Sequence, residues 1–181
     1  MKTLILLLAI VLFSTSSLAE QIAAEKVCVG IDMCVGGHWS MSRVERAYGV
    51  AGKSTEREEG VKQLCLQRGS IYIRLQYDLR SKVGLKGPAA LDVASDGPPD
   101  KCEAIKVKGP ALHLRPIALG ESEANVKNAM GSPDEIWTAD TSDHGILPGE
   151  TGLVYGGGEN NFVLIVLRAG VVVRVAGSVL P

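Results

Sequence analysis

Apolar and polar side chains alternate most regularly over residues 70–78, which read Ser-Ile-Tyr-Ile-Arg-Leu-Gln-Tyr-Asp. A period of two predicts an antiparallel strand with one face in the core and the other toward solvent. Residues 61–67, 89–94 and 102–107 predict further strands, because turn-forming glycine, proline and aspartate residues separate these stretches. We therefore expect an antiparallel sheet in this half of the chain.

The second half of the chain shows the same kind of pattern. Short apolar stretches at residues 135–139, 151–155, 162–168 and 171–176 are divided by polar or glycine-rich turns. Residues 162–167 form a continuous apolar run, Phe-Val-Leu-Ile-Val-Leu, which is too apolar for a solvent-facing edge. This run predicts a strand in the interior of a sheet.

A short helix is predicted ahead of each group of strands. Residues 40–49 and 122–131 share the skeleton Ser-x-x-x-Val-x-x-Ala-apolar-Gly, with apolar residues spaced three and four apart. Each segment begins with a serine able to cap a first helical turn and ends at a glycine suited to a left-handed C-terminal position. A tandem duplication and a chance similarity between two capped short helices both explain this likeness.

A helix followed by a meander of strands, twice over, predicts an α+β fold. We expect two tandem helix-plus-antiparallel-sheet units in two layers. Residues 20–109 would form the N-terminal unit and residues 110–181 the C-terminal unit. The boundary is predicted at Lys108-Gly109-Pro110, a turn-forming sequence between the two patterns.

Residues 1–19 carry the pattern of a secretory signal peptide. A lysine at the start precedes an apolar run over residues 4–13, and a small, polar stretch ends at Ala19. The apolar run is about half the length that a membrane-spanning helix needs. We expect cleavage after Ala19, a periplasmic or secreted product, no membrane span and, because no cysteine stands at the cleavage point, no lipid anchor.

Charge and composition exclude some classes of partner. The chain has 19 basic and 20 acidic side chains, for a net charge of −1. Such a balance disfavours nucleic-acid binding, which needs a clustered basic face. Only 4% of the residues are aromatic, which also disfavours a stacking surface for bases or sugars.

The four cysteines, Cys28, Cys34, Cys65 and Cys102, all lie in the predicted N-terminal unit. An even number in an oxidising compartment predicts two disulfides, and their pairing stays open. A metal site is the alternative, since Cys28, Cys34 and His38 are close in sequence. Their spacing matches no common zinc pattern, so we expect disulfides and no metal.

The C-terminal half resembles the SmpA/OmlA (BamE-like) family. The resemblance rests on residues 117–126, on the Met-Gly-Ser-Pro-Asp stretch at 130–134, on Tyr155-Gly156 and on the predicted hairpin at 168–175. A tandem pair of such units is similar to the fold of secreted β-lactamase-inhibitor proteins. The first resemblance implies envelope assembly, and the second implies inhibition of an enzyme by binding through a sheet surface.

Catalytic motifs are scarce in the sequence. There is no nucleophile elbow, P-loop or His-Glu-x-x-His motif. His144 lies in an Asp- and Ser-rich turn beside two carboxylates, so a small secreted hydrolase using His144 or His113 is an alternative function. A solvated turn explains the same residues. We expect a protein that is not an enzyme and needs no cofactor.

The favoured hypothesis is a non-catalytic protein that binds another protein through its sheet, in envelope assembly or in enzyme inhibition. Alternation over residues 70–78 places Tyr72 and Arg74 on one face, and these residue types are enriched in binding hot spots. Tyr155 stands on the strand that would correspond in the second unit. Trp39 is a further candidate anchor, with a place in the core as its alternative.

Overall fold

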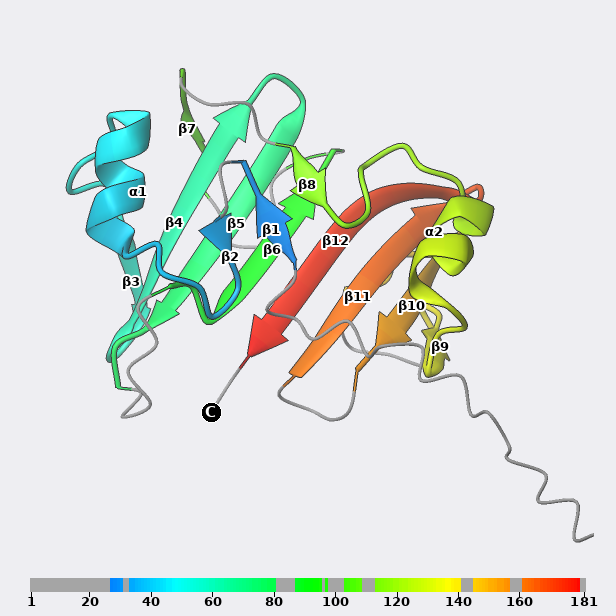
Figure 1. The fold of residues 1–181 in the computed structure, drawn as a ribbon. Coiled ribbons are helices and arrows are strands. Elements are labelled where there is room, and N and C mark those ends of the chain that lie inside the picture. Colours follow the sequence, from blue (N-terminus) through cyan, green and yellow to red (C-terminus); the bar gives the residue numbers. More distant parts are fainter. Residues whose placement is uncertain are drawn as a thin grey trace, which may run out of the picture.

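The structure is a computed structural model, and it describes residues 27–30, 33–80, 87–95, 97, 103–108, 113–140, 145–156 and 161–179 (Figure 1). The two helices are α1 (Met41–Tyr48) and α2 (Glu123–Met130). The strands are β1 (Cys28–Val29), β2 (Met33–Cys34), β3 (Thr55–Glu58), β4 (Val61–Arg68), β5 (Ile71–Asp78), β6 (Ala90–Ala94), β7 (Ile105–Lys106), β8 (Leu114–Arg115), β9 (Glu135–Trp137), β10 (Glu150–Tyr155), β11 (Asn161–Arg168) and β12 (Val171–Val179).

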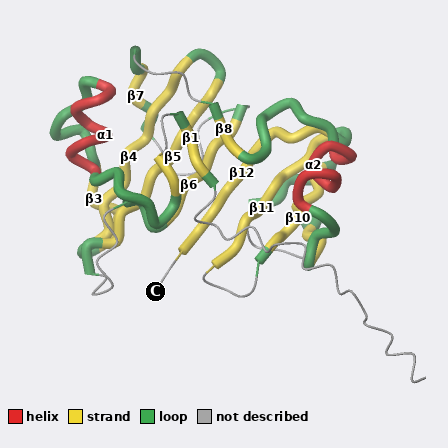
Figure 2. The backbone as a smooth tube through the Cα atoms, viewed as in Figure 1, coloured by secondary structure: helices red, strands yellow, loops and turns green. Residues whose placement is uncertain are grey.

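One large sheet dominates the described part of the chain (Figure 2). It has nine strands in the order β3-β4-β5-β6-β12-β11-β10-β9, with β7 added beside β4. All pairings in it are antiparallel except that of β7 with β4, which is parallel. Strands β1, β2 and β8 form a separate small sheet.

The prediction of an α+β fold made of two tandem helix-plus-sheet units is wrong. The protein is mostly β-sheet, and its only described helices are eight residues long each. Strand β6 of the first half pairs with β12 of the second, so a single sheet runs through both predicted units. The predicted boundary at Gly109-Pro110 lies outside the described residues.

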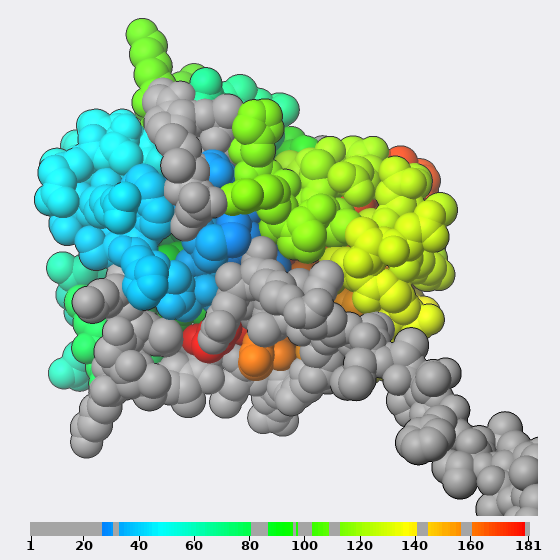
Figure 3. Space-filling view, in the orientation of Figure 1, coloured from blue at the N-terminus to red at the C-terminus, as the bar shows by residue number. Residues whose placement is uncertain are grey.

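The larger hydrophobic core lies on one side of this sheet. Helices α1 and α2 and the hairpin of β1 and β2 all pack on the same face (Figures 1 and 3). The hairpin lies between the helices and contributes Val27, Val29, Met33 and Val35, each at most 1% exposed. A Cβ at Gly177 on β12 would lie 3.4 Å from Val27 and from Val35, an ordinary van der Waals distance, so the hairpin lies directly against β12 at this position.

Both predicted helices are confirmed, with different N-terminal caps. The Ser122 hydroxyl accepts a hydrogen bond from the Asn125 amide at 3.3 Å, as expected for an N-cap. Ser40 makes no such bond, and its hydroxyl lies 3.2 Å from that of Ser42. Gly49 ends α1 with φ at +68°, the left-handed conformation that glycine adopts without strain.

Most predicted strands are present, although β7 and β9 are shorter than predicted, and the short strands β1, β2, β3 and β8 were not predicted. Residues 55–58 form the exposed edge strand β3, which was not among the predicted strands. Its sequence, Thr-Glu-Arg-Glu, has no apolar residue, so hydrophobic patterning gives no signal for it. The predicted interior strand at 162–168 is confirmed as β11, which lies between β10 and β12.

Cysteine pairing is consistent with the predicted oxidising location. Cys28 and Cys34 face each other on β1 and β2 and form a disulfide. Cys65 is also disulfide-bonded. Cys102 and the predicted signal peptide lie outside the described residues. Among the described residues, no helix has the length and apolar character needed to cross a membrane.

We expect non-reducing peptide mapping to recover a Cys28–Cys34 peptide pair and, as the only intramolecular choice left for Cys65, a Cys65–Cys102 pair. Replacing both Cys28 and Cys34 by serine should lower the free energy of unfolding by about 2 kcal/mol, because a short loop is no longer closed in the unfolded chain. Recovery of a peptide that joins Cys28 or Cys34 to Cys65 would contradict this pairing.

Candidate functional site

The side of the nine-stranded sheet opposite α1, α2 and the β1–β2 hairpin is here called the outer face. On β5, Ile73, Leu75 and Tyr77 are buried in the core, so the alternating Tyr72 and Arg74 point to the other side. The outer face is defined by the side chains of Tyr72, Arg74, Gln76, Asp92, Ala94, Trp137, Phe162, Leu164, Val166, Arg174 and Ala176.

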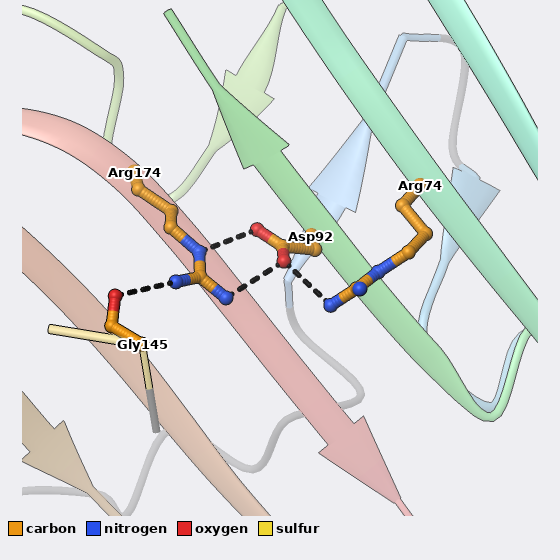
Figure 4. Close-up of polar contacts among 4 residues, drawn as sticks. All are labelled: Arg74, Asp92, Gly145 and Arg174. Carbon is orange, nitrogen blue, oxygen red and sulfur yellow. Dashed lines mark hydrogen bonds and ion pairs between the residues drawn. The ribbon is translucent and has the colours of Figure 1, made fainter. Parts of the chain in front are cut away.

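Asp92 lies at the centre of the outer face, on β6, where the two halves of the sheet meet. Its side chain is 4% exposed and accepts hydrogen bonds from two arginines (Figure 4). Arg74 Nη2 lies 2.8 Å from Oδ2. Arg174 Nε lies 2.8 Å from Oδ1, and its Nη2 lies 2.8 Å from Oδ2. The carboxylate therefore joins β5 to β12 across β6.

Strand register and a bulge bring these three side chains together. Arg74 and Asp92 are direct cross-strand partners, and Arg174 is paired with Ala94, two residues along β6 from Asp92. The pairing of β11 with β12 shifts between Val166 and Leu167, so that Val173 is an extra residue on β12. Val172 and Val175 can both reach the core, while Arg174 reaches the outer face.

The intact arginine–aspartate cluster adds little to the free energy of unfolding, whereas removal of one of its side chains is costly. The two guanidinium groups are 15% and 24% exposed, so all three charges are largely removed from water. A buried charge network adds little stability over a well-packed apolar one, but loss of one partner leaves an uncompensated buried charge. Single substitutions in this cluster are therefore expected to be strongly destabilising.

The other end of the outer face is apolar. Trp137, Phe162 and Val173 are half-buried and pack on a second hydrophobic cluster formed by Ile146, Val154, Leu164 and Val166. The rings of Trp137 and Phe162 lie 6.3 Å apart between centroids and are tilted by 56°, within the range of favourable aromatic pairs.

Hydrogen bonds from two arginines hold the loop at residues 145–149 beside this apolar end. Arg168 Nη2 lies 2.6 Å from Glu150 Oε1, and the Leu147 amide donates to Glu150 Oε2 at 2.9 Å. Arg174 Nη1 also donates to the Gly145 carbonyl at 3.3 Å. Arg174 therefore couples the central cluster to this loop.

Two of the four predicted partner-binding residues lie on the outer face. Tyr72 is half-exposed there, and its hydroxyl oxygen accepts a hydrogen bond from Gln67 Nε2 at 3.1 Å. Arg74 is held by Asp92, as described above. The structure thus brings Tyr72 and Arg74 together with Asp92 and Arg174.

Tyr155 and Trp39 lie elsewhere. Tyr155 is 4% exposed on the core side, where its hydroxyl lies 3.4 Å from the Gly131 carbonyl oxygen, so the prediction that it extends the exposed surface is wrong. Burial, with smaller contributions from Glu123 and Asp134, raises the pKa of Tyr155 to about 12. Trp39 packs against the core cluster, with the Arg43 guanidinium 4.1 Å from the centroid of the ring.

The residues named in the hydrolase alternative are not brought together by the described structure. His113 is exposed next to β8, and His144 lies outside the described residues. Within the described ranges, no group of three His, Cys, Asp or Glu side chains could hold a metal ion.

Asp92 and Arg174 were missed as site residues by the sequence analysis. The stretch Ala-Leu-Asp-Val-Ala at 90–94 does alternate around Asp92, which is a signal that could have placed this carboxylate opposite the buried Leu91 and Val93. Arg174 has no such signal, because the bulge in β12 interrupts the alternation.

Comparison with known proteins gives no relative. No protein-family model, no curated protein and no solved structure matches the chain. The resemblance to the SmpA/OmlA family therefore stays a prediction.

We expect replacement of Asp92 by alanine to lower the free energy of unfolding by about 3–5 kcal/mol, because two largely buried guanidinium groups lose their shared carboxylate. Denaturant unfolding measures this change. The matched control is Glu123→Ala, which removes an exposed ion pair to Lys127 and should cost less than about 1 kcal/mol. Equal losses in the two variants would show that the central cluster does not hold the sheet together.

Proposed function

We propose that this protein binds another protein through the outer face of its sheet. The observation that carries this proposal is the gathering of Tyr72, Arg74, Arg174, Phe162 and Trp137 on one face, each with part of its side chain accessible. Tyrosine, tryptophan and arginine are the residue types that dominate binding hot spots.

The rigidity of this face supports the proposal. Arg74 and Arg174 are held by Asp92, and Tyr72 is held by Gln67. Long side chains that are already fixed lose less conformational entropy when a partner covers them. The backbone beneath them is hydrogen-bonded in the central strands of a continuous sheet, so the spacing of the anchors is set before binding.

The chemistry of the outer face indicates how a partner would be recognised. The charged centre on β5, β6 and β12 would give orientation through hydrogen bonds, whereas the apolar end around Trp137 and Phe162 would give most of the affinity by burial of apolar surface. Both halves of the chain contribute to the face, so one partner would contact the two halves at once.

The proposed setting is the periplasm or the exterior of the cell, after cleavage near Ala19 and without a lipid anchor. The Cys28–Cys34 disulfide supports an oxidising compartment. In that setting the protein acts without catalysis or a cofactor, either in envelope assembly or as an inhibitor that covers the surface of an enzyme.

We expect Tyr72→Ala to weaken binding of a captured partner about 30-fold, because truncation of a hot-spot side chain costs about 2 kcal/mol. The partner is first identified by affinity capture of periplasmic or secreted proteins on the immobilised mature protein, and then titrated against each variant. Thermal unfolding of the same variants separates lost binding from lost folding.

A pair of matched substitutions tests the face itself. Ala94 lies on β6 of the outer face between Tyr72 and Arg174, whereas Ala129 is exposed on α2 on the opposite side of the sheet. Ala94→Gln should block the captured partner, and Ala129→Gln should leave its affinity unchanged. Unchanged affinity in both Tyr72→Ala and Ala94→Gln, with both variants folded, would refute the proposal.

A further inference from the structure

An exposed leucine stands beside the apolar end of the outer face. Leu147 is 55% exposed, which places it among the few large apolar side chains at the surface of the described structure. It belongs to neither hydrophobic cluster of the described residues, so its side chain adds little to the apolar area that folding removes from water. Its role is therefore sought outside the core.

The loop that carries this leucine is anchored at both ends. Ile146 is 5% exposed and packs in the second hydrophobic cluster, and Glu150 is 8% exposed. Glu150 Oε1 accepts a hydrogen bond from Arg168 Nη2 at 2.6 Å. The Gly145 carbonyl accepts one from Arg174 Nη1 at 3.3 Å (Figure 4). The exposed tip of the loop therefore lies between two buried side chains that fix its position on the outer face.

The backbone of Leu147 is held on both sides. Its amide donates to Glu150 Oε2 at 2.9 Å, and its carbonyl accepts from the Glu150 amide at 2.9 Å. The second bond closes a turn with Pro148 and Gly149 at its central positions, and Gly149 has a φ of +84°. Proline followed by glycine is the sequence that a type II turn favours. The turn thus needs its proline and its glycine, but it sets no requirement for a leucine before them.

We propose that Leu147 is an anchor that the outer-face partner takes into an apolar pocket. The inference rests on the proposed function and adds the kind of surface that the partner presents. Because the turn already fixes the backbone of Leu147, less conformational entropy is lost when a partner covers it. The turn borders the apolar end around Trp137 and Phe162, so a protein that covers this end also reaches the leucine. The partner surface therefore has a leucine-sized apolar recess beside a broader apolar area.

The test measures affinity for the partner captured from periplasmic or secreted proteins on the immobilised mature protein. Leu147→Ala should weaken this affinity about tenfold, because most of the exposed leucine side chain is no longer buried in the pocket. Its thermal unfolding should stay unchanged. The control is Leu79→Ala, which shortens a similarly exposed side chain (61%) next to β5 and should bind like the unmodified protein.

A second variant tests the turn and keeps the side chain. Pro148→Gly frees the backbone around Leu147 and should weaken binding about threefold, because more conformational entropy is then lost in the complex. Hydrogen exchange of the Leu147 and Glu150 amides should become faster in this variant, while the amides of β11 keep their protection. Faster exchange with unchanged affinity would show that the partner does not use the fixed turn, and it would overturn the proposal.

The outcomes separate this inference from the proposed function. Weaker binding of Tyr72→Ala with unchanged binding of Leu147→Ala would overturn the anchor and leave the outer face as the binding face. Weaker binding of Leu147→Ala with unchanged Tyr72→Ala and Ala94→Gln would keep the anchor and refute the outer face. Capture of no protein would overturn both. Self-association that is lost in Leu147→Ala would overturn the anchor, since a second copy of the chain would then cover the leucine.

Discussion

The pairing of β6 with β12 is the contact on which the rest of the structure depends. Residues 90–94 and 174–178 lie antiparallel across five cross-strand pairs, and within the nine-stranded sheet these pairs join the described strands of the first half to those of the second. Without them, each half would have an unpaired strand edge and a short helix with little surface to cover. With them, one continuous sheet has the larger core on one face and, on its outer face, the arginine–aspartate cluster beside the second hydrophobic cluster.

Both faces of the sheet reinforce this pairing. On the core side, the β1–β2 hairpin fills the space above β6 and β12, and it lies directly against β12 at Gly177. On the outer face, Asp92 bridges Arg74 and Arg174 across the same strands. The strongest polar cluster of the outer face thus stands where the two halves meet, and the proposed binding face consequently exists only in the joined sheet.

Local sequence patterns predicted the elements well and their arrangement poorly. The period of two in β5 correctly separates Tyr72 and Arg74 from Ile73 and Leu75, and the spacing in α1 and α2 correctly predicts two short helices. The fold class failed because the β6–β12 pairing joins residues about eighty positions apart, and no local pattern reports which strand edges meet. Tyr155 was misplaced because β10 is buried on nearly every residue, so alternation cannot assign its faces. Arg174 was missed because a bulge changes the side to which it points.

Native-state hydrogen exchange tests the central claim, that β6 and β12 join the chain into one cooperative sheet with one outer face. Backbone amides of β6 and β12 should exchange only by global unfolding, with the same opening free energy as the most protected amides of β4, β5 and β11. The claim would be contradicted if amides of β6 and β12 had a lower opening free energy than those of β4 and β11, and if β4 and β11 also differed from each other. That result would mean that the two halves of the chain unfold as separate units that only contact each other.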